Sequence, residues 1–216
     1  MSKVLIINAS ARKERSLSRQ LTNVFAKSWN EKYPNDLFLH REVGQENIPH
    51  VTERWIAGAF KPAHLRNEED HEVLRLSNEL ISELKDSDII VVGTPMYNWS
   101  VPSTLKAYID QVLRVNETVL VRKDNPEQPY LGLLNGKKVY LLLVRGNTGY
   151  GPGEIREHMD FQTNYLKTVF SIMGVEDIEC ITLNDIDHLQ KETLDQVNDQ
   201  IRQLINCQDN VLSVLP

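Results

Sequence analysis

The chain has 216 residues, 41% of them hydrophobic and 25% charged, and its formal net charge is -6. This length is sufficient for one substantial hydrophobic core, so a single domain over residues 1–216 is predicted. The acidic balance argues against a general nucleic-acid-binding surface or an anionic-membrane surface.

Short apolar runs alternate along the chain with amphipathic stretches. The apolar runs predict five strands, at residues 4–7, 37–39, 89–92, 139–144 and 178–181. Apolar residues with a 3.6-residue period predict the helices between and after them, at residues 17–25, 73–84, 105–113, 159–173 and 194–204. The alternation predicts an α/β fold with a doubly wound, five-stranded parallel sheet, helices on both faces and a flavodoxin-like strand order.

Two stretches of the chain do not fit this alternation. Residues 44–67 are long and irregular in pattern, and residues 116–135 interrupt the chain between a helix and the fourth strand. Connections of this length are usually functional or part of an interface. We therefore expect both excursions to lie near a binding site or a protein contact.

A hydroxyl-rich turn, residues 8–18, follows the first predicted strand. Ser16 is the expected N-cap of the next helix, and the free amide groups of a helix start bind anions. Together with the hydroxyls of Ser10, Ser16 and Ser18, these amides predict a site for a phosphate group. The alternative is that the three serines only cap the helix.

An aromatic loop, Pro95-Met96-Tyr97-Asn98-Trp99, follows the third predicted strand. Its flat and polar groups suit a planar heterocycle that is both stacked and hydrogen-bonded, and a flavin ring is the leading candidate. Trp99 is expected to stack on that ring, the alternative being that it packs only against protein. Because ligands of open α/β sheets bind beyond the carboxyl ends of the strands, the loop occupies the expected position.

A glycine-rich loop, residues 145–153, follows the fourth predicted strand. Its glycines would let the backbone approach a ligand closely, although an ordinary strand-to-helix turn has the same composition. The loops after the first, third and fourth strands are expected to converge on one crevice at the switch point of the sheet.

Several other classes of site have no support in the sequence. Neither GxxxxGKS/T nor GxGxxG occurs, which argues against a P-loop or an integral dinucleotide fold. Cys180 and Cys207 form no CxxC pair, and Arg75 replaces the second histidine of an HExxH motif at His71, so no metal site is predicted. No apolar run is long enough for a secretory signal or a membrane span, and a cytoplasmic location is expected.

Short motifs follow one another along nearly the whole chain: residues 1–5, Ser10 and residues 16–18, residues 95–99, Leu105-Lys106-x-Tyr108, residues 136–138 and Arg145-Gly146. In these motifs and their order the chain resembles the FMN-dependent NADH-azoreductase family, a branch of the flavodoxin-like quinone reductases. It departs from the family pattern at Val144-Arg145-Gly146-Asn147, at Val119, and in extra residues around Tyr130. These departures are compatible with FMN binding, but the family's substrate preference does not carry over to this chain from the resemblance.

The resemblance implies an FMN-containing homodimer whose active site lies at the dimer interface. It implies that the phosphate is held by Ser10, Ser16, Leu17 and Ser18. The isoalloxazine ring would be bordered by Pro95, Met96, Tyr97, Asn98 and Trp99. Its pyrimidine side would be closed by Arg145, Gly146 and Asn147.

The expected reaction is a two-step exchange: NADH or NADPH delivers a hydride to flavin N5, and a quinone or azo compound then takes it, with ping-pong kinetics. The cofactor carries this chemistry, so no catalytic side chain is assigned. Asn98 and Asn147 are candidates for hydrogen bonds to the ring edges, and Trp99 and Tyr130 for walls of the substrate cavity. The rival hypotheses are a flavodoxin-like electron carrier or a flavin-binding interaction protein, and, less favoured, a nucleotide-binding hydrolase.

Overall fold

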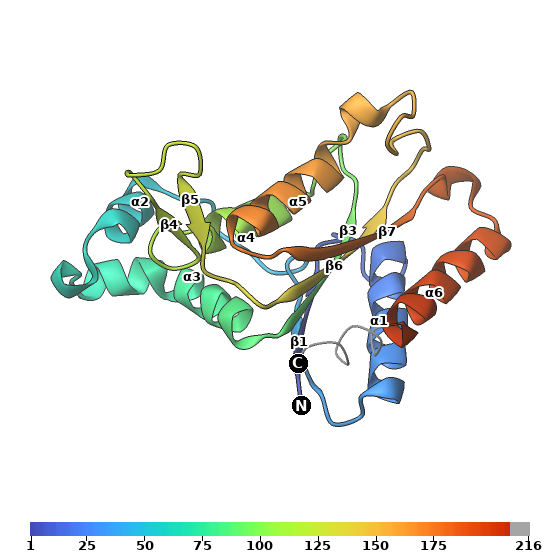
Figure 1. Cartoon of the computed structure of the whole chain (residues 1–216), viewed down its shortest axis with the longest axis horizontal. Helices are drawn as coiled ribbons and strands as arrows, with labels where there is room; N and C mark the ends of the chain where they lie inside the picture. Colours follow the sequence, from blue (N-terminus) through green and yellow to red (C-terminus); the bar gives the residue numbers. More distant parts are fainter. Residues whose placement is uncertain (208–216) are drawn as a thin grey trace.

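The computed structural model describes residues 1–207 and contains a five-stranded parallel sheet with the strand order β2-β1-β3-β6-β7 (Figure 1). Its strands are β1 (Lys3–Asn8), β2 (Leu37–Arg41), β3 (Ile89–Pro95), β6 (Lys138–Val144) and β7 (Asp177–Leu183). All five predicted strands are confirmed, as is the flavodoxin-like order. The single-domain assignment stays a prediction, and its last nine residues lie outside the described part of the chain.

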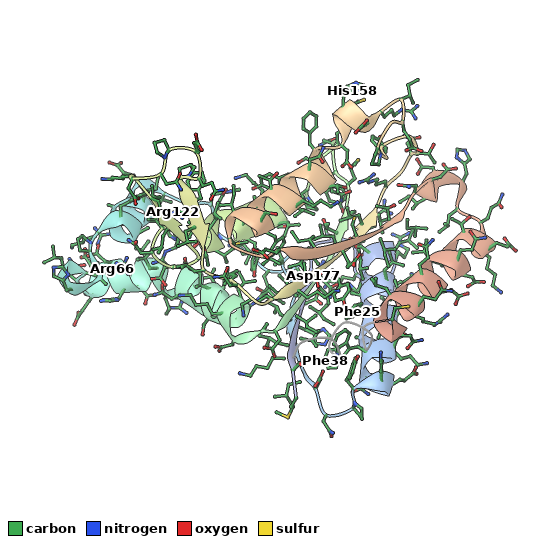
Figure 2. All side chains as sticks on the ribbon, in the orientation of Figure 1. Phe25, Phe38, Arg66, Arg122, His158 and Asp177 are labelled. Carbon is green, nitrogen blue, oxygen red and sulfur yellow. The ribbon has the colours of Figure 1, made fainter. Side chains whose placement is uncertain are left out.

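Helices cover both faces of the sheet (Figure 1). One face carries α1 (Leu17–Lys32) and α6 (Lys191–Asn206), and the other carries α3 (Glu68–Asp86), α4 (Ser103–Val112) and α5 (Phe161–Ile172). Each face has its own apolar cluster. In the cluster below α1 and α6, Phe25 of α1, labelled in Figure 2, packs against Tyr140 of β6 with 4.8 Å between the ring centroids.

The central strands explain why the sheet could be predicted from short apolar runs. In β1, Val4 and Ile6 belong to the cluster under α1 and α6, whereas Leu5 and Ile7 belong to the cluster under α3, α4 and α5. Side chains of a strand alternate between the two faces, so a strand covered on both must be apolar throughout.

The first excursion is less irregular than its sequence indicates. It contains α2 (Glu53–Phe60), for which Thr52 is the N-cap, and a 3-10 turn at Ala63–Leu65. The interpretation of residues 44–67 as irregular is therefore wrong for the part that forms α2 and the 3-10 turn. Only Trp55 and Gly58 of this helix are buried, and two buried residues form no recognisable apolar stripe.

The second excursion forms a small hairpin of β4 (Val119–Val121) and β5 (Tyr130–Gly132), paired antiparallel. No strand was expected here, because two three-residue strands give too short an alternation to recognise. The hairpin packs on the end of α5: a Cβ built on Gly132 would lie 2.0 Å from the backbone nitrogen of Gly174.

The connection from β6 to α5 also differs from the prediction at its end. Met159 was expected in the helix, but it lies in a 3-10 turn, Glu157–Met159, and α5 begins at Phe161 with Asp160 as its N-cap. Figure 2 shows His158, part of this turn, at the outer end of the connection. Within residues 1–207, none of the helices combines the length and apolar composition needed to cross a membrane.

Candidate functional site

A cavity of about 180 Å³ lies beyond the carboxyl ends of the parallel strands. Segments after β1, β3, β6 and β7 all contribute to its wall. The residues that line it are Ser10, Arg12, Arg15, Ser16, Leu17, Ser18, Pro95, Met96, Tyr97, Val144, Gly146 and Ile186. The structure thus brings the three predicted loops together around one crevice.

The serine turn forms one end of this cavity. Ser16 is the N-cap of α1, as predicted, and its Oγ accepts a hydrogen bond from the backbone N–H of Arg19 at 3.3 Å. The hydroxyls of Ser16 and Ser18, both residues buried, lie 3.2 Å apart. Because the first amides of a helix have no partner within it, the turn presents N–H and O–H donors to the cavity.

The sheet beneath the turn fixes its position. A Cβ at Gly93 of β3 would lie 2.4 Å from Cγ2 of Thr22, so only glycine lets α1 approach β3 this closely. The Thr22 hydroxyl donates to Oδ1 of Asn8 at 2.8 Å, and Nδ2 of Asn8 donates to Oε1 of Glu42 at 2.8 Å. The start of α1 is thereby held against the ends of β1 and β3.

The aromatic loop ends in a tight turn with a strained backbone. Reciprocal backbone hydrogen bonds between Tyr97 and Ser100, at 2.9 and 3.0 Å, enclose Asn98 and Trp99. Asn98 has φ of 48° and Trp99 has φ of 64°, a conformation that costs a bulky residue about 1–3 kcal/mol. The turn presents Trp99, 48% exposed, at the surface beside the cavity.

The glycine-rich loop contributes its backbone rather than its arginine. Gly146 lines the cavity, but Arg145 is buried and its guanidinium donates to Oδ2 of Asp160 at 2.8 Å. Contact between the Arg145 side chain and a ligand in the cavity is therefore not supported. Side chains alternate along the end of β6, and the position that follows Val144 turns its side chain away from the cavity.

Four other residues assigned from the sequence do not line this cavity. Asn98 and Trp99 lie in the tight turn beside it, and Asn147 is exposed on the following loop. Tyr130 lies on the β4–β5 hairpin and is 53% exposed. The hairpin packs on the far end of α5, which keeps Tyr130 away from the cavity of its own chain.

Four residues of the cavity wall were missed by the sequence analysis: Arg12, Arg15, Val144 and Ile186. Arg12 and Arg15 lie within the serine turn, and their charge beside three serines was a usable signal for an anion site. Ile186 follows β7, and no local pattern indicates that this segment folds over the cavity. Its backbone N–H donates to the carbonyl of Arg145 at 3.3 Å, a contact that only the tertiary structure provides.

A larger groove of about 830 Å³ adjoins the cavity between α4 and α5. Tyr97 borders both spaces. The groove is lined by Tyr97, Asn98, Ser100, Val101, Ser103, Lys106, Phe161, Asn164, Tyr165 and Thr168. Burial, with a smaller contribution from Asp110, raises the pKa of Tyr165 to about 12, so its hydroxyl is protonated and able to donate at neutral pH.

Acidic, histidine and cysteine side chains do not gather into a metal site in this structure. Within residues 1–207, no three such side chains are placed to hold a metal ion together. The cavity wall itself presents serine hydroxyls, two arginines and the ring of Tyr97.

Comparison with known proteins gives one family and several relatives. A family model described as a flavodoxin-like fold matches residues 2–205. The FMN-dependent NADH:quinone oxidoreductase of Nostoc punctiforme is 40% identical over 186 residues, which cover 86% of this chain and 88% of the relative. The FMN-dependent NAD(P)H:quinone oxidoreductase 1 of Pseudomonas aeruginosa is 40% identical over 182 residues, covering 84% and 86%.

Solved structures agree with this relationship. The azoreductase of Bacillus anthracis superposes with a TM-score of 0.83 at 25% identity, covering 95% of this chain and 99% of its own. An FMN-dependent NADH-azoreductase of the same species, solved in complex with FMN, gives a TM-score of 0.84 at 22% identity, covering 95% and 98%.

Proposed function

The chain belongs to the family of FMN-dependent NADH:quinone oxidoreductases with the flavodoxin-like fold, and from this premise we propose that it reduces quinones and azo compounds with electrons from NADH or NADPH. The observation that carries the proposal is the cavity at the carboxyl edge of the sheet, where the serine turn, the aromatic loop and Gly146 meet. These are the segments that a phosphate and a flat ring would need.

The serine turn fits the phosphate of FMN. The hydroxyls of Ser10, Ser16 and Ser18 lie beside the first amides of α1, and Arg12 and Arg15 add positive charge. A helix start contributes only about 0.3–1 kcal/mol to anion binding, whereas each charge-assisted hydrogen bond contributes about 1.5–3 kcal/mol. The hydroxyls and arginines therefore supply most of the affinity for a dianion.

The remaining walls fit the flavin ring. Pro95, Met96 and Tyr97 would border one side, and the backbone at Gly146 would face the pyrimidine edge. Asn98 and Asn147 are the proposed hydrogen-bond partners of the ring edges. When bound, FMN would take a hydride at N5 from the nicotinamide and pass it to the acceptor in a second step, which predicts ping-pong kinetics.

We propose that the active enzyme is a homodimer with its active sites at the interface. Tyr97, Trp99 and Phe161 are exposed large apolar side chains, and they lie on or beside the groove that adjoins the cavity. A patch of this kind marks a contact surface or a binding groove. A second copy seated on it would enclose the quinone or azo substrate. The role of Tyr130 as a cavity wall stays a prediction for that assembly.

The absorption spectrum of the freshly purified protein tests the cofactor. Flavin bands are expected, and they should be lost in the Ser16→Ala/Ser18→Ala variant. The matched control is Ser82→Ala/Ser171→Ala, which removes two exposed serines far from the turn and should retain the flavin. A colourless wild-type protein that takes up no added FMN would refute the proposal.

Anaerobic mixing separates the enzyme from an electron carrier. An oxidoreductase should be bleached rapidly by NADH or NADPH and recover its colour with benzoquinone. A flavodoxin-like carrier, or a flavin-binding interaction protein, would keep its oxidised spectrum in the presence of either nucleotide. Initial rates at several fixed quinone concentrations should give parallel double-reciprocal plots, and intersecting lines would reject the ping-pong scheme.

A further inference from the structure

We propose that Arg145 is a positioning residue that holds together the walls around the flavin ring, without touching the flavin. This inference rests on the proposed function and deepens it. Its basis is a set of contacts at the carboxyl edge of the sheet. The buried Arg145 side chain contacts the start of α5 and Tyr150, Gln162 extends the network to β3, and the backbone carbonyl of Arg145 bonds to Ile186.

The first contact joins Arg145 to the start of α5. Its Nη2 donates to Oδ2 of Asp160 at 2.8 Å and to the hydroxyl of Thr163. Asp160 is the N-cap of α5, because its other oxygen, Oδ1, accepts from the backbone N–H of Thr163 at 2.9 Å. Both members of the ion pair are buried, so the pair is rigidly placed and sensitive to loss of either partner.

The second contact reaches the strand that precedes the aromatic loop. Nε of Arg145 donates to Oε1 of Gln162 at 3.3 Å, and Nε2 of Gln162 donates to the carbonyl of Thr94 at 3.3 Å. Gln162 and Thr94 are fully buried, and Thr94 is followed directly by Pro95 of the cavity wall. Gln162 therefore links Arg145 of the glycine-rich loop to the base of the aromatic loop.

Two more contacts of Arg145 are made with Tyr150 of the glycine-rich loop and with Ile186, which follows β7. The guanidinium carbon of Arg145 is 5.5 Å from the ring centroid of Tyr150, which is itself buried. The carbonyl of Arg145 accepts from Ile186, another residue of the cavity wall. The Arg145 side chain is thus linked through Gln162 to Thr94, directly before Pro95 of the wall, whereas Ile186 of the wall is held by the Arg145 backbone carbonyl.

The serine turn stands outside this network. Among the described residues, none of the hydrogen bonds or ion pairs connects Arg145, Asp160 or Gln162 to residues 10–18. The turn is held instead through Asn8, Thr22 and Glu42. The cavity therefore has two separately supported ends, and damage to the Arg145 network should weaken binding of the ring while leaving binding of the phosphate unchanged.

The test compares FMN with riboflavin, which carries the same ring without the phosphate. Both are titrated into the flavin-free full chain, with flavin fluorescence reporting Kd. Gln162→Met keeps the Arg145–Asp160 ion pair and removes both hydrogen bonds of the Gln162 side chain, the one from Arg145 and the one to Thr94. It should weaken both ligands about tenfold, since one buried hydrogen bond to a charged group is lost. The ratio of the two Kd values should equal that of the wild type.

Two further variants distinguish loss of ring binding from loss of phosphate binding. Ser16→Ala/Ser18→Ala should give the opposite pattern, weakening FMN while leaving riboflavin unchanged. Arg145→Lys keeps the charge beside Asp160 but loses the planar geometry that reaches Gln162, so it should weaken both ligands and alter the visible circular dichroism of the bound flavin. A glutamine that only stabilised the fold would lower the Tm of the flavin-free chain without changing either Kd.

The inference would be overturned if Gln162→Met and Arg145→Lys bound both ligands with the same Kd values as the wild type. A change in the ratio of the two Kd values in these variants would overturn it as well. Failure of the proposed function looks different, because the wild-type chain itself would then bind neither FMN nor riboflavin.

Discussion

Gly44 shows how closely the serine turn is packed from below. Its backbone N–H donates to the carbonyl of Asn8 at 2.9 Å, and a Cβ built on it would lie 2.1 Å from the carbonyl oxygen of Ser10. The obstacle is backbone on both sides, so neither segment can rotate away as a flexible side chain would. The position of Ser10 therefore requires a residue without a Cβ at position 44, in the segment after β2.

Gly44→Ala is expected to displace Ser10 and weaken FMN binding about tenfold, because overpacking of this kind costs about 1–3 kcal/mol. The control is Gly58→Ala in α2, where the nearest atom to the new Cβ is Cγ1 of Val73 at 3.4 Å. Replacing this helical glycine should raise the free energy of unfolding by up to about 1 kcal/mol. FMN titration and thermal unfolding of both variants check the pair, and unchanged FMN affinity in Gly44→Ala would contradict the account.

The turn at residues 97–100 has a strained backbone, which lowers the stability of the fold, and it holds the aromatic ring of Trp99 in place. Two-residue turns with positive φ at both central positions favour Asn-Gly, and here the second position holds tryptophan. A bulky residue in that conformation is strained, yet the turn keeps Trp99 beside the cavity and the groove. Strain of this kind is common where a side chain must be held for function.

Trp99→Gly should therefore stabilise the flavin-free chain by about 1 kcal/mol through relief of strain. The same substitution should weaken flavin or quinone binding, because an aromatic face worth about 0.5–1.5 kcal/mol is removed. Trp99→Phe is the control: it keeps the ring and the strained backbone, so its Tm and its affinity should stay near the wild type. A Trp99→Gly chain that is both less stable and fully active would refute this explanation.

In the molecule as a whole, exposed apolar side chains lie both on the groove beside the cavity and away from it. Phe161, 60% exposed, lines the groove between α4 and α5, while Leu37, 50% exposed, lies on the edge strand β2 at the other side of the sheet. The proposed homodimer would cover the groove and leave the edge strand free. Dimerisation and completion of the active site would then depend on the same surface.

Phe161→Asp is expected to convert the proposed dimer to a monomer, because it would place a charge in the proposed interface, and the cores of such interfaces are depleted of charge. Light scattering coupled to gel filtration measures the mass, and quinone reduction should fall with it. Leu37→Asp introduces the same change outside the groove and should leave both mass and activity unchanged. A monomeric wild-type protein with full activity would reject the proposed interface.

The amino-acid sequence was sufficient for the five strands of the parallel sheet and for two of the three loops. β1, β3 and β6 are buried on both faces, and this leaves continuous apolar runs that can be recognised locally. The serine turn and the aromatic loop could be assigned because their side chains directly follow such runs. The flavodoxin-like order then followed from the rules for connections between parallel strands.

Only the tertiary structure decided which side chains face the cavity. Arg145 and Gly146 are neighbours in sequence, but the alternation along β6 and the buried partner Asp160 turn the arginine away from it. Ile186 is held at the wall by a backbone hydrogen bond to Arg145, the residue that follows β6 and lies far from it in the sequence. Strand and turn propensities act over a few residues, whereas the direction of a side chain at a sheet edge depends on contacts between distant segments, and these exist only in the folded molecule.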